Sequence, residues 1–179
     1  LADDSSIISG YFADSTFFSG ASITSAGYND IFVSQLDADR NVLWTKRFGS
    51  TGYDLSYGST VLENGDSLIT GYFNGTVSFD GTSLSSAGDS DGYVTKLDSS
   101  GNVLWVKKFG GTGTDTVYDI SLLGDSCYIS GYFAGSVAFG DTTLTSNGGY
   151  DSFYAKLDSN GDVVWAKGYG STGHDGGND

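Results

Sequence analysis

The sequence contains no proline, no methionine, one cysteine and one histidine among its 179 residues. A lone cysteine, Cys127, can close no disulfide within the chain and cannot form a cysteine-based metal cluster. The lone histidine, His174, lies in a glycine-rich C-terminal stretch, with no serine or cysteine at a spacing typical of a catalytic pair. Because nucleophile and base must lie within hydrogen-bond reach, we expect no Ser-His-Asp or Cys-His enzyme.

Positive charge is also scarce. Eight Lys and Arg face 22 Asp and Glu, which gives a formal net charge of -14 and a pI near 4.1. The resulting field repels phosphate backbones and anionic lipids, so nucleic acid and membrane surfaces are not expected partners. No apolar run approaches the roughly 20 residues of a transmembrane helix. The chain starts at Leu1 without a signal-peptide pattern, so we expect a mature protein or an excised part of a longer one.

The abundant residues are glycine, serine, threonine and the aromatics. Glycine occurs 28 times and aromatics make up 15% of the sequence, whereas strong helix formers are rare. This composition predicts an all-β protein with many turns.

A Trp-centred segment occurs three times, with Trp44, Trp105 and Trp165 spaced 61 and 60 residues apart. The same offset aligns Gly-Tyr-Phe motifs and Leu-Asp pairs along the whole chain. We therefore expect one repeat domain, 1–179, with copies at 1–61, 62–121 and 122–179. A period of this size is typical of propeller blades or solenoid coils.

Each copy is expected to contain four strands. In the middle copy, the stretches rich in β-formers are 68–73, 92–97, 103–109 and 116–122. A turn glycine follows the second stretch, and Arg40 replaces that glycine in the first copy, which predicts local strain or a different turn type there.

Each copy also carries an added hairpin. In the middle copy, Asp80-Gly81 predicts a two-residue turn that pairs Phe79 with Thr82 and Val77 with Leu84. Gly140-Asp141 and Ser19-Gly20 predict the same hairpin in the other copies. Because these hairpins recur at one place, we expect them to form a periodic contact surface. Its apolar residues are Val77, Phe79, Leu84, Val137, Phe139, Leu144, Phe18 and Ile23.

Both faces of the predicted strands are apolar. In 103–109, Trp105 and Phe109 point one way, while Leu104 and Val106 point the other. An antiparallel sheet with one wet face would alternate apolar and polar residues, so each sheet is expected to lie between two others. We therefore predict β-propeller-like blades of four antiparallel strands, in which the three tryptophans are structural.

Three blades are fewer than the roughly four to eight that close a propeller ring. A strand equivalent to 115–121 is absent ahead of the first copy and is replaced by glycines after the last, so one blade at each end is expected to be incomplete. The sequence therefore predicts open blade edges that pair with other copies of the chain or with the rest of a longer one.

The runs DIFVSQLDADRNVLW, DGYVTKLDSSGNVLW and DSFYAKLDSNGDVVW each lead into a glycine-rich FGSTG, FGGTG or YGSTG segment. This pattern resembles the bacterial and archaeal SBBP-type β-propeller repeats, in which a similar run marks each blade, and it covers almost the whole chain. The resemblance implies a secreted or cell-surface repeat protein, and it supplies no catalytic residues. The acidic charge and the Ser and Thr content favour the same extracellular location.

Few residues are candidates for specific sites. Asp89 and Asp91 lie in an Asp-Ser-Asp-Gly stretch that offers oxygen ligands for calcium but lacks the EF-hand pattern, and the alternative is a solvated acidic turn. Asn74 begins an Asn-Gly-Thr glycosylation acceptor. Loop aromatics that offer rings for stacking on sugars are Tyr28, Tyr53 and Tyr150.

The function favoured by these patterns is a non-catalytic extracellular or cell-surface β-propeller module that acts as a structural scaffold, an adhesion element or a filament-forming unit. Two other classes stay open: a calcium-dependent or glycan-binding propeller module and, ranked below it, a carbohydrate-acting enzyme. An enzyme would gather carboxylates in one copy, whereas here they recur in every copy, as Asp30, Asp91 and Asp151 do. No cofactor is expected apart from calcium.

Overall fold

The computed structural model describes residues 5–18, 21–124 and 126–176 of the chain. Within these ranges every regular element is a β-strand, and all the paired strands run antiparallel. The expected all-β class is therefore confirmed. The same residues include no helix with the length and apolar character needed to cross a membrane.

Three main sheets follow one another along the chain, and each is built from strands that lie close together in the sequence. Sheet 1 has the order β1-β4-β5 and contains β1 (Ser6–Phe12), β4 (Asp30–Leu36) and β5 (Val42–Phe48). Sheet 2 has the order β6-β7-β10-β11 and contains β6 (Leu55–Val61), β7 (Ser67–Phe73), β10 (Asp91–Leu97) and β11 (Val103–Phe109). Sheet 3 has the order β12-β13-β14-β15 and contains β12 (Thr116–Leu123), β13 (Ser126–Phe139), β14 (Thr142–Leu157) and β15 (Val163–Tyr169).

The added hairpins form as the turn signals predict. In the middle copy, β8 (Thr76–Phe79) and β9 (Thr82–Ser85) pair in the expected register. In the third copy, the far ends of β13 and β14 pair in the same way. In the first copy, β2 (Ser15–Phe18) pairs with β3 (Ala21–Thr24), and the Ser19-Gly20 turn lies outside the described residues.

The sheets are offset from the sequence repeats by one strand. The strand β6 ends the first repeat but pairs with β7 of the second, and β12 likewise joins β13. A short turn in which the Leu62 amide donates to Asp66 O at 2.8 Å links β6 to β7, and such a turn makes sequential strands neighbours. Sheet 3 consequently has four strands, because β12 from the second copy joins β13, β14 and β15 of the last one, so the expectation of an incomplete last blade is wrong. Sheet 1 has three described strands.

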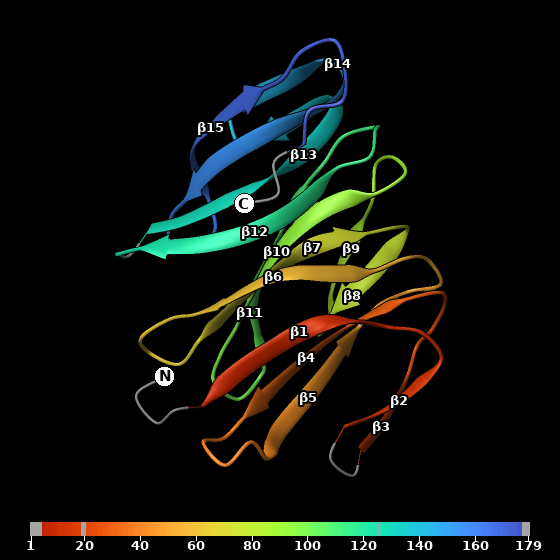
Figure 1. Cartoon of the computed structure of the whole chain (residues 1–179), viewed down its shortest axis with the longest axis vertical. Coiled ribbons are helices and arrows are strands. Elements are labelled where there is room, and N and C mark those ends of the chain that lie inside the picture. Colours follow the sequence, from red (N-terminus) through yellow and green to blue (C-terminus); the bar gives the residue numbers. More distant parts are fainter. Residues whose placement is uncertain (1–4, 19–20, 125, 177–179) are drawn as a thin grey trace.

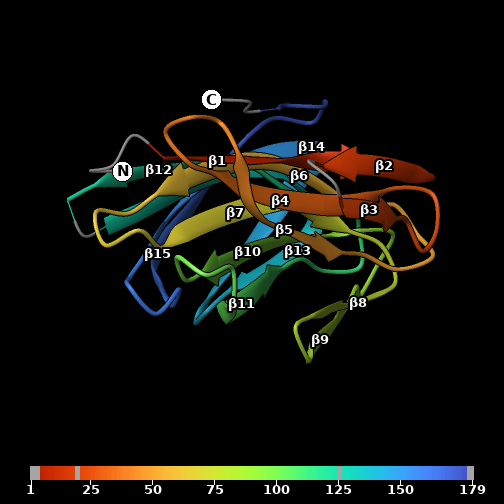
Figure 2. The ribbon, with the colours of Figure 1, turned by 90° about the horizontal axis from the view of Figure 1, so that it is seen from below.

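The sheets stack face to face, with sheet 1 at the bottom and sheet 3 at the top of Figure 1. Figures 1 and 2 both place β1, β6 and β12 on one side of the stack. We call the interface between sheets 1 and 2 seam 1, and that between sheets 2 and 3 seam 2. Sheet 2 is covered on both faces, as the two apolar faces of its strands predict.

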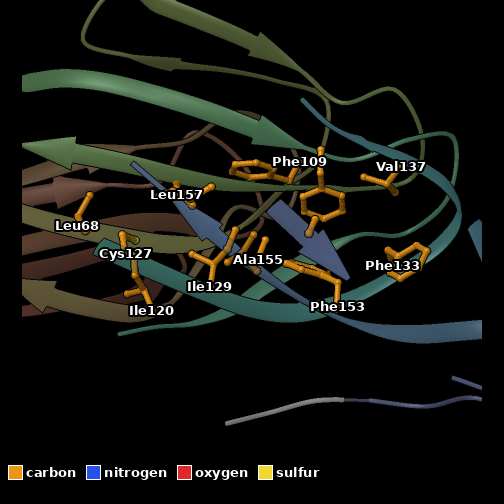
Figure 3. Packing of buried hydrophobic residues seen from close by; sticks show 14 residues of the cluster. Leu68, Phe109, Ile120, Cys127, Ile129, Phe133, Val137, Phe153, Ala155 and Leu157 are labelled. Carbon is orange, nitrogen blue, oxygen red and sulfur yellow. The ribbon is translucent and has the colours of Figure 1, made fainter. Parts of the chain in front are cut away.

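Each seam is an apolar core. Seam 1 buries residues of sheets 1 and 2, namely Ile31, Val33, Phe48, Ile69, Phe73, Val77, Phe79, Tyr93 and Leu97. Seam 2 is larger, and Figure 3 shows residues of sheet 2 such as Phe109 meeting Ile129, Phe153 and Leu157 of sheet 3. Burying a large apolar side chain contributes about 1.5–3 kcal/mol, so the seams are the main source of stability.

The hairpin residues expected to contact a partner lie inside these seams. The Phe79 ring centroid is 5.1 Å from that of Phe48 in sheet 1 and 5.2 Å from that of Tyr93 in sheet 2. Phe139 repeats this contact in seam 2. Four of the expected contact residues are buried: Val77, Phe79, Val137 and Phe139. The other four are partly buried: Phe18, Ile23, Leu84 and Leu144.

The prediction of a partner surface is therefore wrong for the four buried residues. The apolar faces of the second and third hairpins close the ends of seams 1 and 2, since Phe79 contacts Phe48 of sheet 1 and Phe139 contacts Phe109 of sheet 2. These two hairpins cover the core.

Each of the first two tryptophans packs on the turn of the next sheet. The Trp44 indole N–H donates to Ser99 O at 3.1 Å, and a Cβ built on Gly101 would lie 2.9 Å from the Trp44 ring. A Cβ on Gly161 would lie 2.8 Å from the Trp105 ring. Both glycines also have positive φ, at 81° and 77°. Arg40 takes the same turn with φ of 67°, which confirms the predicted strain, and its side chain is exposed.

We expect Gly101→Ala to destabilise the fold more than Gly75→Ala. Both glycines have nearly the same φ, 81° and 80°, so alanine pays a similar backbone cost at each, but only Gly101 lies against the Trp44 ring. Crowding of a packed site adds about 1–3 kcal/mol to the loss. Urea unfolding measures both, and equal midpoints for the two variants would contradict the packing role of the tryptophan.

Candidate functional site

The face of sheet 1 that points away from sheet 2 is apolar, and neither of the other two main sheets in the described residues packs on it. We call it the N-terminal end face, and it contains Ile8, Phe18, Phe32 and Leu36. Ile8 is 41% exposed, whereas Ile69 and Ile129, at the same place in sheets 2 and 3, are 0% exposed. The difference arises because seam 1 covers Ile69 and seam 2 covers Ile129.

The opposite end of the stack exposes the other half of a seam. We call this surface of sheet 3 the C-terminal end face, and it contains Tyr128, Tyr154, Trp165 and Tyr169. Tyr154 is 40% exposed, whereas Val33 and Val94 at the equivalent positions are 0% exposed. Tyr169 is 59% exposed, whereas the equivalent Phe48 and Phe109 are 1% and 4% exposed.

The aromatic rings of the C-terminal end face contact one another. The Tyr128 and Tyr154 rings are stacked with centroids 5.8 Å apart, and the Trp165 ring lies 5.6 Å from Tyr154. The Lys156 ammonium lies 5.8 Å from the Tyr128 ring centroid. Since tyrosine and tryptophan combine apolar rings with polar tips, this face tolerates water and still offers apolar area to a partner.

Three loop carboxylates, Asp54, Asp115 and Asp175, occupy the same place in the three copies but differ in their hydrogen bonds. Asp54 and Asp115 each accept an amide of their own loop and one from the next sheet, at Asn74 and Ala134, both at 3.1 Å. Asp175, the third copy, binds the amide and the hydroxyl of Ser171 in its own loop. Within the described residues, Asp54 and Asp115 thus each connect two segments, whereas the bonds of Asp175 stay within its own loop.

A row of tyrosines follows the inner strands on the side of β6 and β12. Tyr57 and Tyr118 are the extra residues of β-bulges in these strands, and their ring centroids lie 4.9 Å apart. The row continues through Tyr132 to Tyr150 and the His174 ring. A β-bulge turns its extra side chain away from the hydrogen-bonded strand pair, so the tyrosine rings of this row lie beside the seams.

The loop tyrosines expected to stack on sugars join these clusters. Tyr28 and Tyr53 stack on each other with centroids 4.7 Å apart and planes at 7°, which occupies one face of each ring. Tyr150 packs against Tyr132 and His174. Their role in sugar binding stays a prediction.

The recurring carboxylates of the second strand of each copy serve the fold. Asp30 and Asp91 are buried and pair with Arg47 at 2.5 Å and Lys108 at 2.9 Å. Burial raises the pKa of Asp30 in spite of the Arg47 guanidinium and the Ala26 amide. Asp151 has no such cation in the described residues, because Gly168 replaces the lysine, and its Oδ2 accepts hydrogen bonds from the backbone and side-chain amides of Asn147.

The calcium candidates do not converge. Asp91 holds the Lys108 ammonium and the Ala87 amide, while Asp89 is exposed and its carbonyl accepts the Asn74 side-chain amide. Among the residues that the structure describes, no three His, Cys, Asp or Glu side chains gather as metal ligands. Asn74, the glycosylation candidate, thus uses its amide nitrogen within the fold. Calcium binding and glycosylation stay predictions.

The lone cysteine and the lone histidine lie in different surroundings. Cys127 is buried in seam 2, and burial raises the pKa of its thiol to about 12, which keeps it protonated. His174 accepts the Tyr150 amide at 3.3 Å through Nδ1.

Sequence reasoning missed the two end faces as surfaces. A signal existed, because the third copy has tyrosine where the other copies have valine or phenylalanine, at Tyr154 and Tyr169. No protein-family model matches this chain, and no curated protein matches it either.

We expect the Asp115 carboxyl to titrate near pH 6. Burial and the nearby Asp91 charge raise its pKa to about 6, whereas the Asn102 hydrogen bonds lower the pKa of the Asp98 carboxyl below 3.8. The folded state therefore binds the Asp115 proton more tightly than the unfolded chain, so lowering the pH from 7 towards 5 stabilises the fold through this group. Carboxyl-detected NMR measures both midpoints, and a midpoint for Asp115 at or below that of Asp98 would contradict the burial.

Proposed function

We propose that the chain is a non-catalytic, β-propeller-like repeat module of an extracellular or cell-surface scaffold. In this proposal it joins a second copy, or further repeats, head to tail through its two end faces. The supporting observation is that positions buried in both internal seams are exposed at the two ends of the same chain, as at Ile8 and Tyr169.

The two end faces are the two halves of one kind of seam. Residues of the N-terminal end face occupy the places that Ile69, Tyr93 and Leu97 occupy in seam 1. Residues of the C-terminal end face occupy the places of Leu68, Val94 and Phe109 in seam 2. A head-to-tail contact would therefore continue the stacking that already holds the three sheets together.

The side chains of the C-terminal end face are larger than their counterparts in the internal seams. Sheet 1, which carries the N-terminal end face, has fewer described strands than sheets 2 and 3. The C-terminal end face is larger, because Tyr128 and Tyr154 replace Leu68 and Val94. Among the described residues, sheet 1 has no counterpart of β12, the strand that carries Val117 and Ile120 into seam 2. This difference would leave room for the larger rings of the C-terminal end face. Arg40 would stand opposite Trp165, where a guanidinium can lie over the indole ring.

A head-to-tail contact between copies is heterologous, so it either closes into a ring or grows into a fibre. Two chains with three sheets each would bring the total within the roughly four to eight blades of a propeller ring. A scaffold or filament-forming role follows from either outcome. The carboxylates support a non-catalytic role, since they recur in the copies and bind backbone amides or cations of the fold.

We expect Ile8→Lys and Tyr154→Lys each to abolish self-association, because a lysine on either face would be buried without a partner. An equimolar mixture of the two variants should form a dimer of defined mass, since each retains the one face that the other needs. Light scattering after size-exclusion chromatography, over a range of protein concentrations, measures the masses.

Leu104→Lys is the matched control. Leu104 is exposed, and so are Leu43 and Val164 at the same place in the other sheets, so this position lies outside the seams. The control should associate like the parent chain. A parent chain that is monomeric at all concentrations, or a mixture that forms no dimer, would overturn the proposal.

A further inference from the structure

Seam 2 contains a cavity of about 700 Å³ at the end of the sheets where the turns lie. Its floor is apolar and is formed by Leu68, Leu122 and Cys127, beside the Trp105 ring. Its polar lining includes Lys96, and its rim includes the exposed side chains of Glu63 and Ser159. Sites for small ligands have volumes of roughly 300–1,000 Å³ and combine an apolar lining with a few polar groups.

Trp44, the equivalent tryptophan of seam 1, has two hydrogen-bond acceptors for its indole N–H within the protein. Gln35 lies opposite Trp44 in the β4–β5 pair, and its Oε1 accepts the indole N–H at 2.7 Å. The same N–H also reaches Ser99 O of the next sheet at 3.1 Å. Together these contacts close seam 1 around the ring.

One substitution changes this arrangement in seam 2. Lys96 stands opposite Trp105, in the place of Gln35, and offers the indole no acceptor. Its ammonium turns instead to Asp66, at 2.9 Å. The Trp105 indole N–H makes no hydrogen bond to the described part of the chain, although Ser159, the counterpart of Ser99, lines the same cavity. With respect to the described residues, the Trp105 ring at this cavity therefore carries an N–H donor without an acceptor.

The lining selects the chemistry of a ligand. Glu63 and Asp158 at the cavity, the internally neutral Lys96–Asp66 pair and the net charge of -14 disfavour an anion. The indole ring and the aliphatic floor favour a ligand with an apolar surface, and the indole N–H favours one with a hydrogen-bond acceptor. The Lys96 ammonium, the Ser159 hydroxyl and the carboxylates of Glu63 and Asp158 offer further hydrogen bonds. A sugar ring presents C–H groups on one face and hydroxyls at its edge, so it satisfies both requirements.

We propose that this cavity binds a small uncharged carbohydrate, of one or two sugar rings, with Trp105 as the stacking platform. The site lies between sheets 2 and 3 of a single chain. It therefore does not depend on head-to-tail association, and a monomeric variant such as Ile8→Lys can be tested for it.

The test is a titration of the whole chain with a panel of neutral mono- and disaccharides, followed by calorimetry and by saturation-transfer NMR. Lys96→Gln reproduces the seam 1 arrangement, since glutamine accepts the indole N–H and removes the ammonium from the cavity. Ser159→Tyr narrows the mouth from an exposed turn position. We expect each variant to weaken sugar binding about tenfold or more, the loss expected for about 1.4 kcal/mol.

Lys156→Gln is the matched control, because Lys156 stands opposite Trp165 in the same register but faces the C-terminal end face. It should bind sugars like the parent chain. Far-UV circular dichroism and the unfolding midpoint verify that the variants are folded. The proposal is overturned if no sugar of the panel binds, if Lys96→Gln and Ser159→Tyr both leave binding unchanged, or if only a cationic probe such as tryptamine binds.

Discussion

The structure depends on one constraint: each sheet of this chain is apolar on both faces and needs a neighbour on each side. The residues that meet this need are the same from copy to copy, with Ile69 and Ile129 at 0% exposure in the two internal seams. Most other features follow from it. The hairpins cover the ends of the seams, the tryptophans lie on the following turns, and buried carboxylates such as Asp115 fasten one loop to the next sheet.

Comparison of the three copies also shows the positions at which they carry different residues. Gly101 and Gly161 lie under a tryptophan of the preceding sheet, whereas Arg40 is exposed in the same turn with a positive φ. Tyr154 and Tyr169 replace apolar residues where sheet 3 meets no further described sheet. Lys96 stands where the first copy has Gln35 and the third has Lys156, and a cavity lies beside it. These positions, at which the copies differ, are where we place the interactions with other molecules.

Much of the fold could be predicted from the sequence because it rests on local rules. The four strands of the middle copy and the register set by Asp80-Gly81 follow from alternation and turn chemistry, and both are confirmed. The sequence could not show that β6 pairs forward with β7, since pairing depends on which neighbour the turn brings within reach. It also could not show that Phe79 faces the core, because an apolar hairpin face suits either a partner or the chain itself. The cavity depends on how two side chains, Lys96 and Trp105, orient in three dimensions, so the spacing of residues in the sequence does not predict it.

The central claim is that coverage on both faces stabilises each sheet, and hydrogen–deuterium exchange of the backbone amides tests it most directly. Under native conditions the account predicts that the amides of β7 and β10, in the sheet with neighbours on both sides, exchange most slowly. The hydrogen-bonded amides of β4 in sheet 1 and of β14 in sheet 3 should exchange faster in a dilute monomer. Equal protection across the three sheets, or slowest exchange in sheet 1, would contradict the account.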